Sequence, residues 1–195
     1  LRNSLIIGAF VTVISVPLGA LMAWLMVRTD IPGKRLLSAL ILIPYMIPSW
    51  CKALSWMTVF RNPSMGGNGV LSSLGIPVPD TLASGFVPII IVMVMHYYAF
   101  SYIMASGALR SINSELEEMG EIQGASRPQI LKSITLPLIL PAFLSATIMT
   151  ISKSIGTYGV AARLGGNNPD GTPFYVLATR MKDFINSSPK GTGYA

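Results

Sequence analysis

The chain has 195 residues, of which 51% are hydrophobic and only 11% are charged, whereas soluble domains carry about 25% charged residues. Its formal charge of +6 comes from 14 lysines and arginines that stand singly or in pairs. They form no basic face, which argues against a nucleic-acid partner. A single cysteine, Cys51, and a single histidine, His96, exclude an internal disulfide and a zinc or iron–sulfur ligand set, so we expect no metal and no cofactor.

The first half of the chain contains two long apolar segments. Residues 4–27 carry no charge and would form a helix of about 36 Å, enough to cross a hydrocarbon core of about 30 Å. After a short polar turn, residues 36–60 are apolar apart from Lys52. They predict a second span, kinked at Pro44 and Pro48.

A loop and a third span follow. Residues 61–85 are dense in glycine, proline and asparagine and predict an outer loop, with one short helical turn at residues 70–74. Residues 86–109 are uncharged and predict a third span with His96 near its middle. A histidine at that depth favours an interhelical hydrogen bond, with a substrate or proton site as the alternative.

Residues 135–155 predict a fourth span, which bears Lys153. The polar tail beyond it predicts one amphipathic helix at residues 174–185 and no further span. Because the chain begins with Leu1 and not with methionine, we interpret the sequence as part of a longer polypeptide.

Two lysines lie within the predicted spans, Lys52 and Lys153, each toward the outer end of its span. A charge at that depth must reach water, a partner or a cavity. One interpretation is that both lysines extend to the membrane surface. The other is that both face a translocation path and attract an anionic or chelated substrate.

The distribution of lysine and arginine predicts the orientation in the membrane, because basic loops remain in the cytoplasm. Residues 28–35 and 110–134 are basic, whereas residues 61–85 contain only Arg61. We therefore expect the first and third loops inside the cell, and both chain ends outside.

The third loop contains signals for a first short helix. Ser114 and Glu117 have the spacing of a capping box, and further acidic residues place negative charge at the helix start. Gly124 suits a C-terminal cap in the left-handed conformation. The helix is predicted from about residue 115 to residue 123.

A second short helix is predicted directly after the first. Ser126 and Gln129 form another capping-box pattern, with Pro128 in the first turn. The chain then restarts as the fourth span at Thr135. Two helices joined at an angle would thus project between spans three and four. They are either a functional loop or only a well-capped connection between the two spans.

The spacing of Glu118, Gly124, Ile134, Leu136 and Pro137 resembles the EAA loop of the permeases of bacterial binding-protein-dependent ABC importers. The two alanines of that motif are Met119 and Gly120 here. The resemblance extends over nearly the whole chain. Residues 46–50 and the tail at residues 159–180 are most similar to permeases of the ferric-iron, polyamine and thiamine type. It implies that a set of loop residues couples to an ATPase: Glu118, Gly124, Ala125, Ile134, Leu136 and Pro137.

The resemblance implies an all-α membrane protein, a partial type I importer permease core with about four transmembrane helices and a cytoplasmic coupling-helix loop. Residues 1–195 would be one transmembrane domain without its last core span, and residues 110–137 the coupling loop. Lys52, His96 and Lys153 are candidates for the translocation path.

Such a permease is a multi-pass protein of the bacterial cytoplasmic (inner) membrane and hydrolyses nothing itself. The implied partners are a cytoplasmic ATP-binding subunit, a periplasmic or extracellular substrate-binding protein, a second permease half or copy, and membrane lipid. Ferric iron is the suggested substrate. A secondary transporter or channel is the alternative, although only His96 stands at the midplane of a span. A membrane-embedded enzyme would need paired acids, a metal set or an activated nucleophile, which the residues do not supply.

Overall fold

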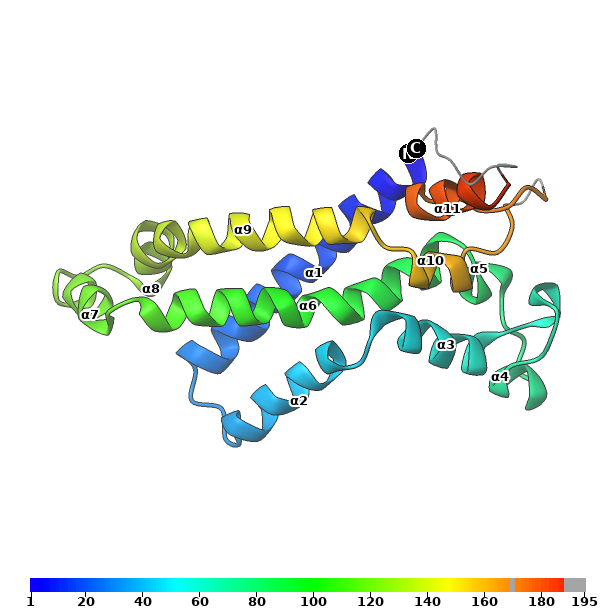
Figure 1. Cartoon of the computed structure of the whole chain (residues 1–195). Coiled ribbons are helices and arrows are strands. Elements are labelled where there is room, and N and C mark those ends of the chain that lie inside the picture. Colours follow the sequence, from blue (N-terminus) through cyan, green and yellow to red (C-terminus); the bar gives the residue numbers. More distant parts are fainter. Residues whose placement is uncertain (169–170, 188–195) are drawn as a thin grey trace.

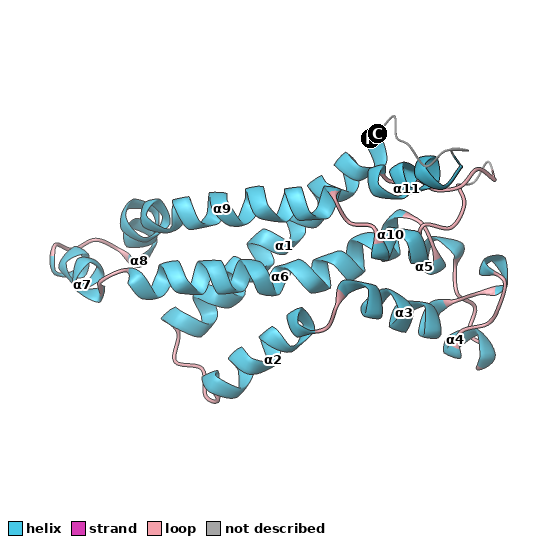
Figure 2. Cartoon of the chain, viewed as in Figure 1, coloured by secondary structure: helices cyan, strands magenta, loops and turns pink. Residues whose placement is uncertain are grey.

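The computed structural model describes residues 1–168 and 171–187, except for the side chain of Ser114. In these ranges the elements are helices joined by loops, as Figure 2 shows. Three of them are long and apolar enough to cross a membrane: α1 (Arg2–Arg28), α6 (Phe86–Ser111) and α9 (Leu136–Ile155). A broken pair, α2 (Lys34–Met46) and α3 (Ser49–Phe60), is the fourth candidate. The prediction of an all-α membrane protein is confirmed.

The second predicted span is broken and not merely kinked, because α2 and α3 meet at 89°. Pro48 has no N–H and forces the preceding residue out of the helical region, and Ile47 is accordingly extended (φ −82°, ψ 124°). Pro44, the other predicted kink, stays inside α2. The 13 residues of α2 reach only about 20 Å, which is less than the hydrocarbon core.

Helices α1, α6 and α9 pack against one another and form the body of the molecule (Figure 1). The closest approach is at Gly19 of α1, where a Cβ atom would lie 2.4 Å from the Tyr98 carbonyl oxygen of α6. Helix α2, in contrast, contributes no buried residue. The buried core includes the following side chains: Ile7, Val11, Ala23, Ile89, Met93, Tyr102, Leu109, Val160 and Leu164.

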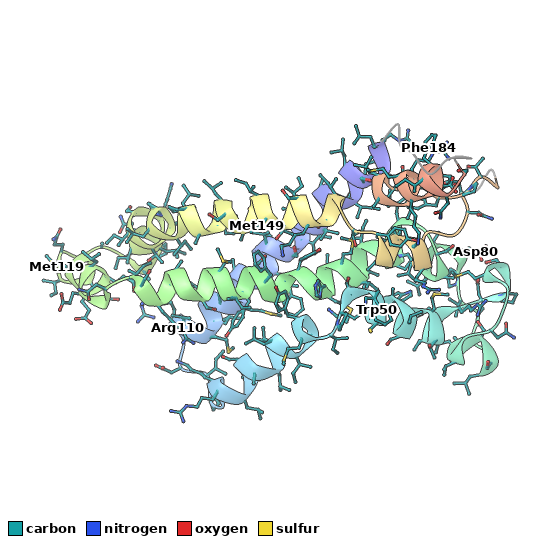
Figure 3. The ribbon with its side chains drawn as sticks, viewed as in Figure 1. Trp50, Asp80, Arg110, Met119, Met149 and Phe184 are labelled. Carbon is teal, nitrogen blue, oxygen red and sulfur yellow. The ribbon has the colours of Figure 1, made fainter. Side chains whose placement is uncertain are left out.

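The short elements lie at the two ends of this body. At one end lie α7 (Ser114–Ile122), α8 (Arg127–Ile130) and the turn between α1 and α2. At the other lie α3, α4 (Val70–Ser73), α5 (Asp80–Ala83), α10 (Gly159–Leu164) and α11 (Leu177–Ser187). A short 3₁₀ turn, Pro63–Met65, also belongs to the loop after α3. In Figure 3, Arg110 and Met119 mark the first end, and Asp80 and Phe184 the second.

This arrangement places the two basic loops at the same end, as the predicted orientation requires. Which end faces the cytoplasm stays a prediction. The helical turn predicted at residues 70–74 is present as α4. The amphipathic tail helix begins later than predicted, because Phe174 and Val176 are buried in the core ahead of α11, with Phe174 edge-on to Phe86. Helix α10, which packs against α3, was not predicted.

Candidate functional site

The loop between the third and fourth spans begins with α7, which is capped by Asn113. The Asn113 side-chain oxygen accepts the Glu115 backbone N–H at 3.1 Å. The predicted cap was Ser114, whose side chain lies outside the described residues. Its predicted partner Glu117 turns away from the cap, and its Oε1 accepts the Thr135 hydroxyl at 2.7 Å. The helix start was thus predicted within one residue, but asparagine, an equally strong N-cap, takes the position.

The end of α7 is a complete Schellman motif, and it confirms the predicted role of Gly124. Gly124 is left-handed, with φ +83°. The Ala125 N–H donates to the Gly120 carbonyl at 3.0 Å, and the Gly124 N–H donates to the Glu121 carbonyl at 2.9 Å. These are the two hydrogen bonds that define the motif. They fix the angle at which the chain leaves α7.

Helix α8 follows with the predicted capping interaction. The Gln129 side-chain oxygen accepts the Ser126 backbone N–H at 2.7 Å and the Ser126 hydroxyl at 2.8 Å. The prediction of a separate second helix is wrong, however, because α8 continues through a π turn (Leu131–Thr135) into α9. Pro137 explains the π turn: without a proline N–H, the carbonyl four residues earlier has no helical donor, and the local hydrogen bonds widen.

The residues assigned to ATPase coupling differ in exposure. Glu118 and Pro137 are exposed, Ala125 and Ile134 are half-buried, and Leu136 is 50% exposed. Gly120 faces the body, since a Cβ there would lie 3.1 Å from the Ile130 side chain. On the outer side of α7, three large apolar side chains are exposed: Leu116, Met119 and Ile122. The loop therefore presents an apolar and acidic surface at the tip of the molecule.

A second constellation lies around the break between α2 and α3. Lys52, in the first turn of α3, places its Nζ 2.8 Å from His96 Nδ1. His96 and Lys153 line one cavity of about 360 Å³. Tyr45 stacks on the His96 ring at 5.3 Å between centroids, and Lys153 Nζ lies 5.5 Å from the Phe100 centroid. The remaining lining residues are Tyr97, Gly156 and Thr157.

The three ionisable side chains predicted for the translocation path, Lys52, His96 and Lys153, are therefore brought together from three helices. An ammonium group only donates hydrogen bonds, so His96 Nδ1 accepts from Lys52 and the ring hydrogen resides on Nε2. The Pro44 backbone carbonyl lies near the ring. That carbonyl is available because Pro48, four residues later, has no N–H to donate. The helix break and the histidine site are thus parts of one structure.

The neighbouring tyrosines of α6 hold α2 in place. The Tyr98 hydroxyl donates to the Ile41 carbonyl at 3.1 Å, and the Tyr102 hydroxyl donates to Ser38 Oγ at 3.0 Å. These contacts show that an aromatic stripe can serve packing. Within the part of the chain that the structure describes, no group of three or more histidine, cysteine or acidic side chains could hold a metal ion.

Sequence reasoning missed two features of these sites. Tyr45 carries no motif that would place it on His96, and only the break at Pro48 brings it there. The sequence indicates for Arg28 only a role in setting the orientation in the membrane. In the structure, however, its Nη2 lies 3.1 Å from Glu117 Oε1. The available signal was weak: a basic residue at the end of one span and an acidic residue in a loop on the same side.

Helices long and apolar enough to cross a membrane, with a capped loop between two of them, are typical of a multi-pass membrane protein. A profile of the family described as "Binding-protein-dependent transport system inner membrane component" matches residues 15–192, and the chain belongs to this family. It is thus a component of the inner membrane, and the predicted resemblance of the chain to such permeases is confirmed at the level of the family. The coupling role of the loop stays a prediction.

Relatives with assigned roles include a probable sulfate transport system permease protein, cysT, of Chlorokybus atmophyticus. It is 28% identical over 93% of this chain and 62% of its own length. The trehalose/maltose permease MalF of Thermococcus litoralis is 30% identical, over 88% of this chain and 59% of its own. The molybdenum permease ModB of Escherichia coli is 25% identical over 87% and 72%. The chain spans between about half and three-fifths of the length of the sulfate-type relatives.

Solved structures share the fold. A bacterial alginate ABC transporter in complex with an alginate-bound periplasmic protein superposes with a TM-score of 0.72 at 20% identity, over 94% of this chain and 65% of the other. The methionine ABC transporter MetNI, in an inward-facing conformation, gives a TM-score of 0.62 at 21% identity, over 94% and 75%. These likenesses show the architecture alone.

Proposed function

We propose that this chain is the translocating part of the permease of an ATP-driven importer and couples to a cytoplasmic ATPase through residues 118–137. The observation that carries the proposal is the capped loop of α7 and α8. It projects from the end where the basic loops gather, and its geometry is fixed by its own caps, by the Gly124 turn and by its continuity with α9. A loop that must transmit force needs such a fixed geometry.

In this proposal α7 docks onto an ATP-binding subunit. Glu118 and the exposed apolar side chains of α7 form the docking surface, and Gly124 with Ala125 sets its angle. Ile134, Leu136 and Pro137 join the loop to α9, so that a displacement of α7 tilts that helix. A substrate-binding protein would deliver substrate at the opposite end, and a second permease half would complete the path. Rocking of the two halves alternates access from one side to the other.

The cavity around His96 favours an anionic substrate. Lys153 lines the cavity and Lys52 contacts its histidine, and none of the described residues that line it is a carboxylate. The field in the cavity therefore favours an anion. Sulfate and the acidic polysaccharide alginate, named for a relative and for a structural neighbour, are anions, although the trehalose/maltose permease serves neutral sugars. Ferric iron, suggested by the tail and residues 46–50, fits this cavity as an anionic chelate and not as a bare cation.

A secondary transporter or channel is the competing function. It would need coupling-ion or selectivity groups at the midplane, and Lys52 with His96 is the one candidate pair among the described residues. It would not need the capped loop. ATP dependence of uptake separates the two functions.

The test uses the full-length permease, its ATPase and its binding protein in reconstituted vesicles. Uptake of a radiolabelled anion should require ATP and the binding protein. Glu118→Ala should lower ATP-driven uptake, because the exposed carboxylate contacts the ATPase. The matched control is Glu115→Ala on the same helix, where the loss of an N-terminal charge costs no more than about 1 kcal/mol. Uptake without ATP, or equal effects of the two substitutions, would contradict the proposal.

A further inference from the structure

Three residues from three separate elements meet at the inner side of α7. Glu117 Oε1 lies 3.1 Å from Nη2 of Arg28, the last residue of α1, and accepts the hydroxyl of Thr135, the last residue of the π turn, at 2.7 Å. The side chains of Arg28 and Glu117 are only 18% and 23% exposed, and Thr135 is 3% exposed. We infer that this clasp of Arg28, Glu117 and Thr135 transmits the movement of α7 to α1 and α9 together.

The clasp matters because α7 has little other attachment to the body. None of its described residues is buried, and its backbone packs chiefly against α8 and the π turn. Gly120 adds an apolar contact with Ile130 and Ile134, which belong to the same continuous α8–α9 rod. Without Glu117, a displacement of α7 would therefore act on α9 and, through the two linking residues Ile112 and Asn113, on α6, but not on α1. Arg28 extends the displacement to α1, which the chain does not join to α7.

The partners of Glu117 are placed where small movements have large effects. Thr135 ends a π turn, and such turns are sites at which a helix changes its register or direction. Arg28 ends α1, which packs along α6 and α9 over its length. A pull on Glu117 thus acts on the inner ends of two long helices at once, as rigid-body rocking requires.

The surroundings distinguish this ion pair from ordinary surface pairs. Water screens exposed pairs, which contribute little, and Lys34 with Asp30 is such a pair in the same inner region, at 3.2 Å with side chains 35% and 108% exposed. The Arg28–Glu117 pair is mostly shielded, so water and salt screen it less, and neutralising one partner leaves the other charge unpaired in shielded surroundings. Lys34 and Asp30 therefore provide a matched control.

The inference rests on the proposed function, and its test is made in the same reconstituted complex. Arg28→Gln, Glu117→Gln and Thr135→Val are compared with Lys34→Gln. The ratio of substrate transported to ATP hydrolysed should fall at least about fivefold in the first two variants, which is the lower end of ordinary coupling between sites. It should fall less in Thr135→Val, which keeps the ion pair, and stay unchanged in Lys34→Gln. Affinity for the ATPase should stay within about twofold in all of them.

A charge exchange separates transmission from folding. The double variant Arg28→Glu with Glu117→Arg restores the ion pair with the charges exchanged. Its ratio of substrate transported to ATP hydrolysed should be higher than the ratio of Arg28→Glu alone or of Glu117→Arg alone. Wild-type ratios in Arg28→Gln and Glu117→Gln would overturn the inference while leaving the importer intact. So would a parallel loss of ATPase binding or thermal stability without recovery in the double variant. If the unaltered complex shows no ATP-driven uptake, the proposed function itself fails, and the inference falls with it.

Discussion

Gly124 offers the sharpest perturbation of the loop, because its cost can be worked out from the backbone alone. Its φ of +83° lies in the left-handed region, and a Cβ atom there would meet no heavy atom within 4 Å. In Gly124→Val the new side chain therefore clashes with nothing outside its own backbone. The penalty is the left-handed conformation itself, about 1–2 kcal/mol for a residue with a Cβ.

One local rearrangement relieves this strain. The chain relieves it by giving up the two Schellman hydrogen bonds at the end of α7, after which the angle between α7 and α8 is no longer fixed. If the ATPase binds only the native angle, its affinity should fall by the corresponding factor, roughly 5- to 30-fold. Gly124→Asn should lose much less, since asparagine visits the left-handed region routinely.

Co-purification and equilibrium binding of the full permease with its ATPase measure the effect, and ATP-driven uptake measures its consequence. The matched control is Gly75→Val in the outer loop, where φ is +77° and the space around a Cβ is equally empty. It carries the same backbone strain far from the ATPase. Wild-type binding and uptake in Gly124→Val would refute the reasoning, as would an equal loss in Gly75→Val.

Lys52→Ala and Lys153→Ala should each leave membrane insertion intact but lower uptake of an anionic substrate, with Lys52→Arg less affected because it keeps the charge; normal uptake in both alanine variants, at normal membrane levels, would show that the lysines only reach the membrane surface. In a Cys51→Ser background, cysteines introduced by Asn68→Cys and Gln129→Cys should be labelled from opposite sides of intact cells. Labelling of both from one side would show that the orientation is wrong.

The elements that could be predicted are those that a local sequence signal specifies. Long uncharged segments marked α1, α6 and α9 to within a few residues, and the glycine at the end of α7 marked its cap. These signals need no knowledge of the rest of the chain, because a helix of apolar residues or a left-handed turn is favoured by its own sequence.

The sharp break between α2 and α3 was only half predictable. Two prolines mark a disturbed helix, but Pro44 and Pro48 are equivalent in the sequence. The structure uses them differently: Pro44 stays helical with its carbonyl near His96, and the chain turns at Pro48. The two prolines carry the same local signal, so the place at which the chain turns is a tertiary property.

The pairings that make the candidate sites were not predictable, for the same reason. Lys52 meets His96, and Arg28 meets Glu117, across 44 and 89 positions of sequence. A sequence shows that an isolated charge near a membrane needs a partner, but packing of the helices selects the partner. Lys153 on α9 and Tyr45 on α2 likewise line one cavity.

The two sites stand at different ends of one helix, and this relation supports a mechanical link between them. Thr135 precedes α9 and Lys153 lies near its other end, so about 27 Å of helix separates them. Helix α9 packs against both α1 and α6, and the backbones of α1 and α6 lie close together at Gly19. Helix α2 buries no residue, but the Tyr98 and Tyr102 hydroxyls tie it to α6, and it ends at the 89° break beside His96. A tilt of α9 applied at the clasp would therefore move Lys153 relative to Tyr45 on α2 and His96 on α6, and the cavity that these three residues line would change shape.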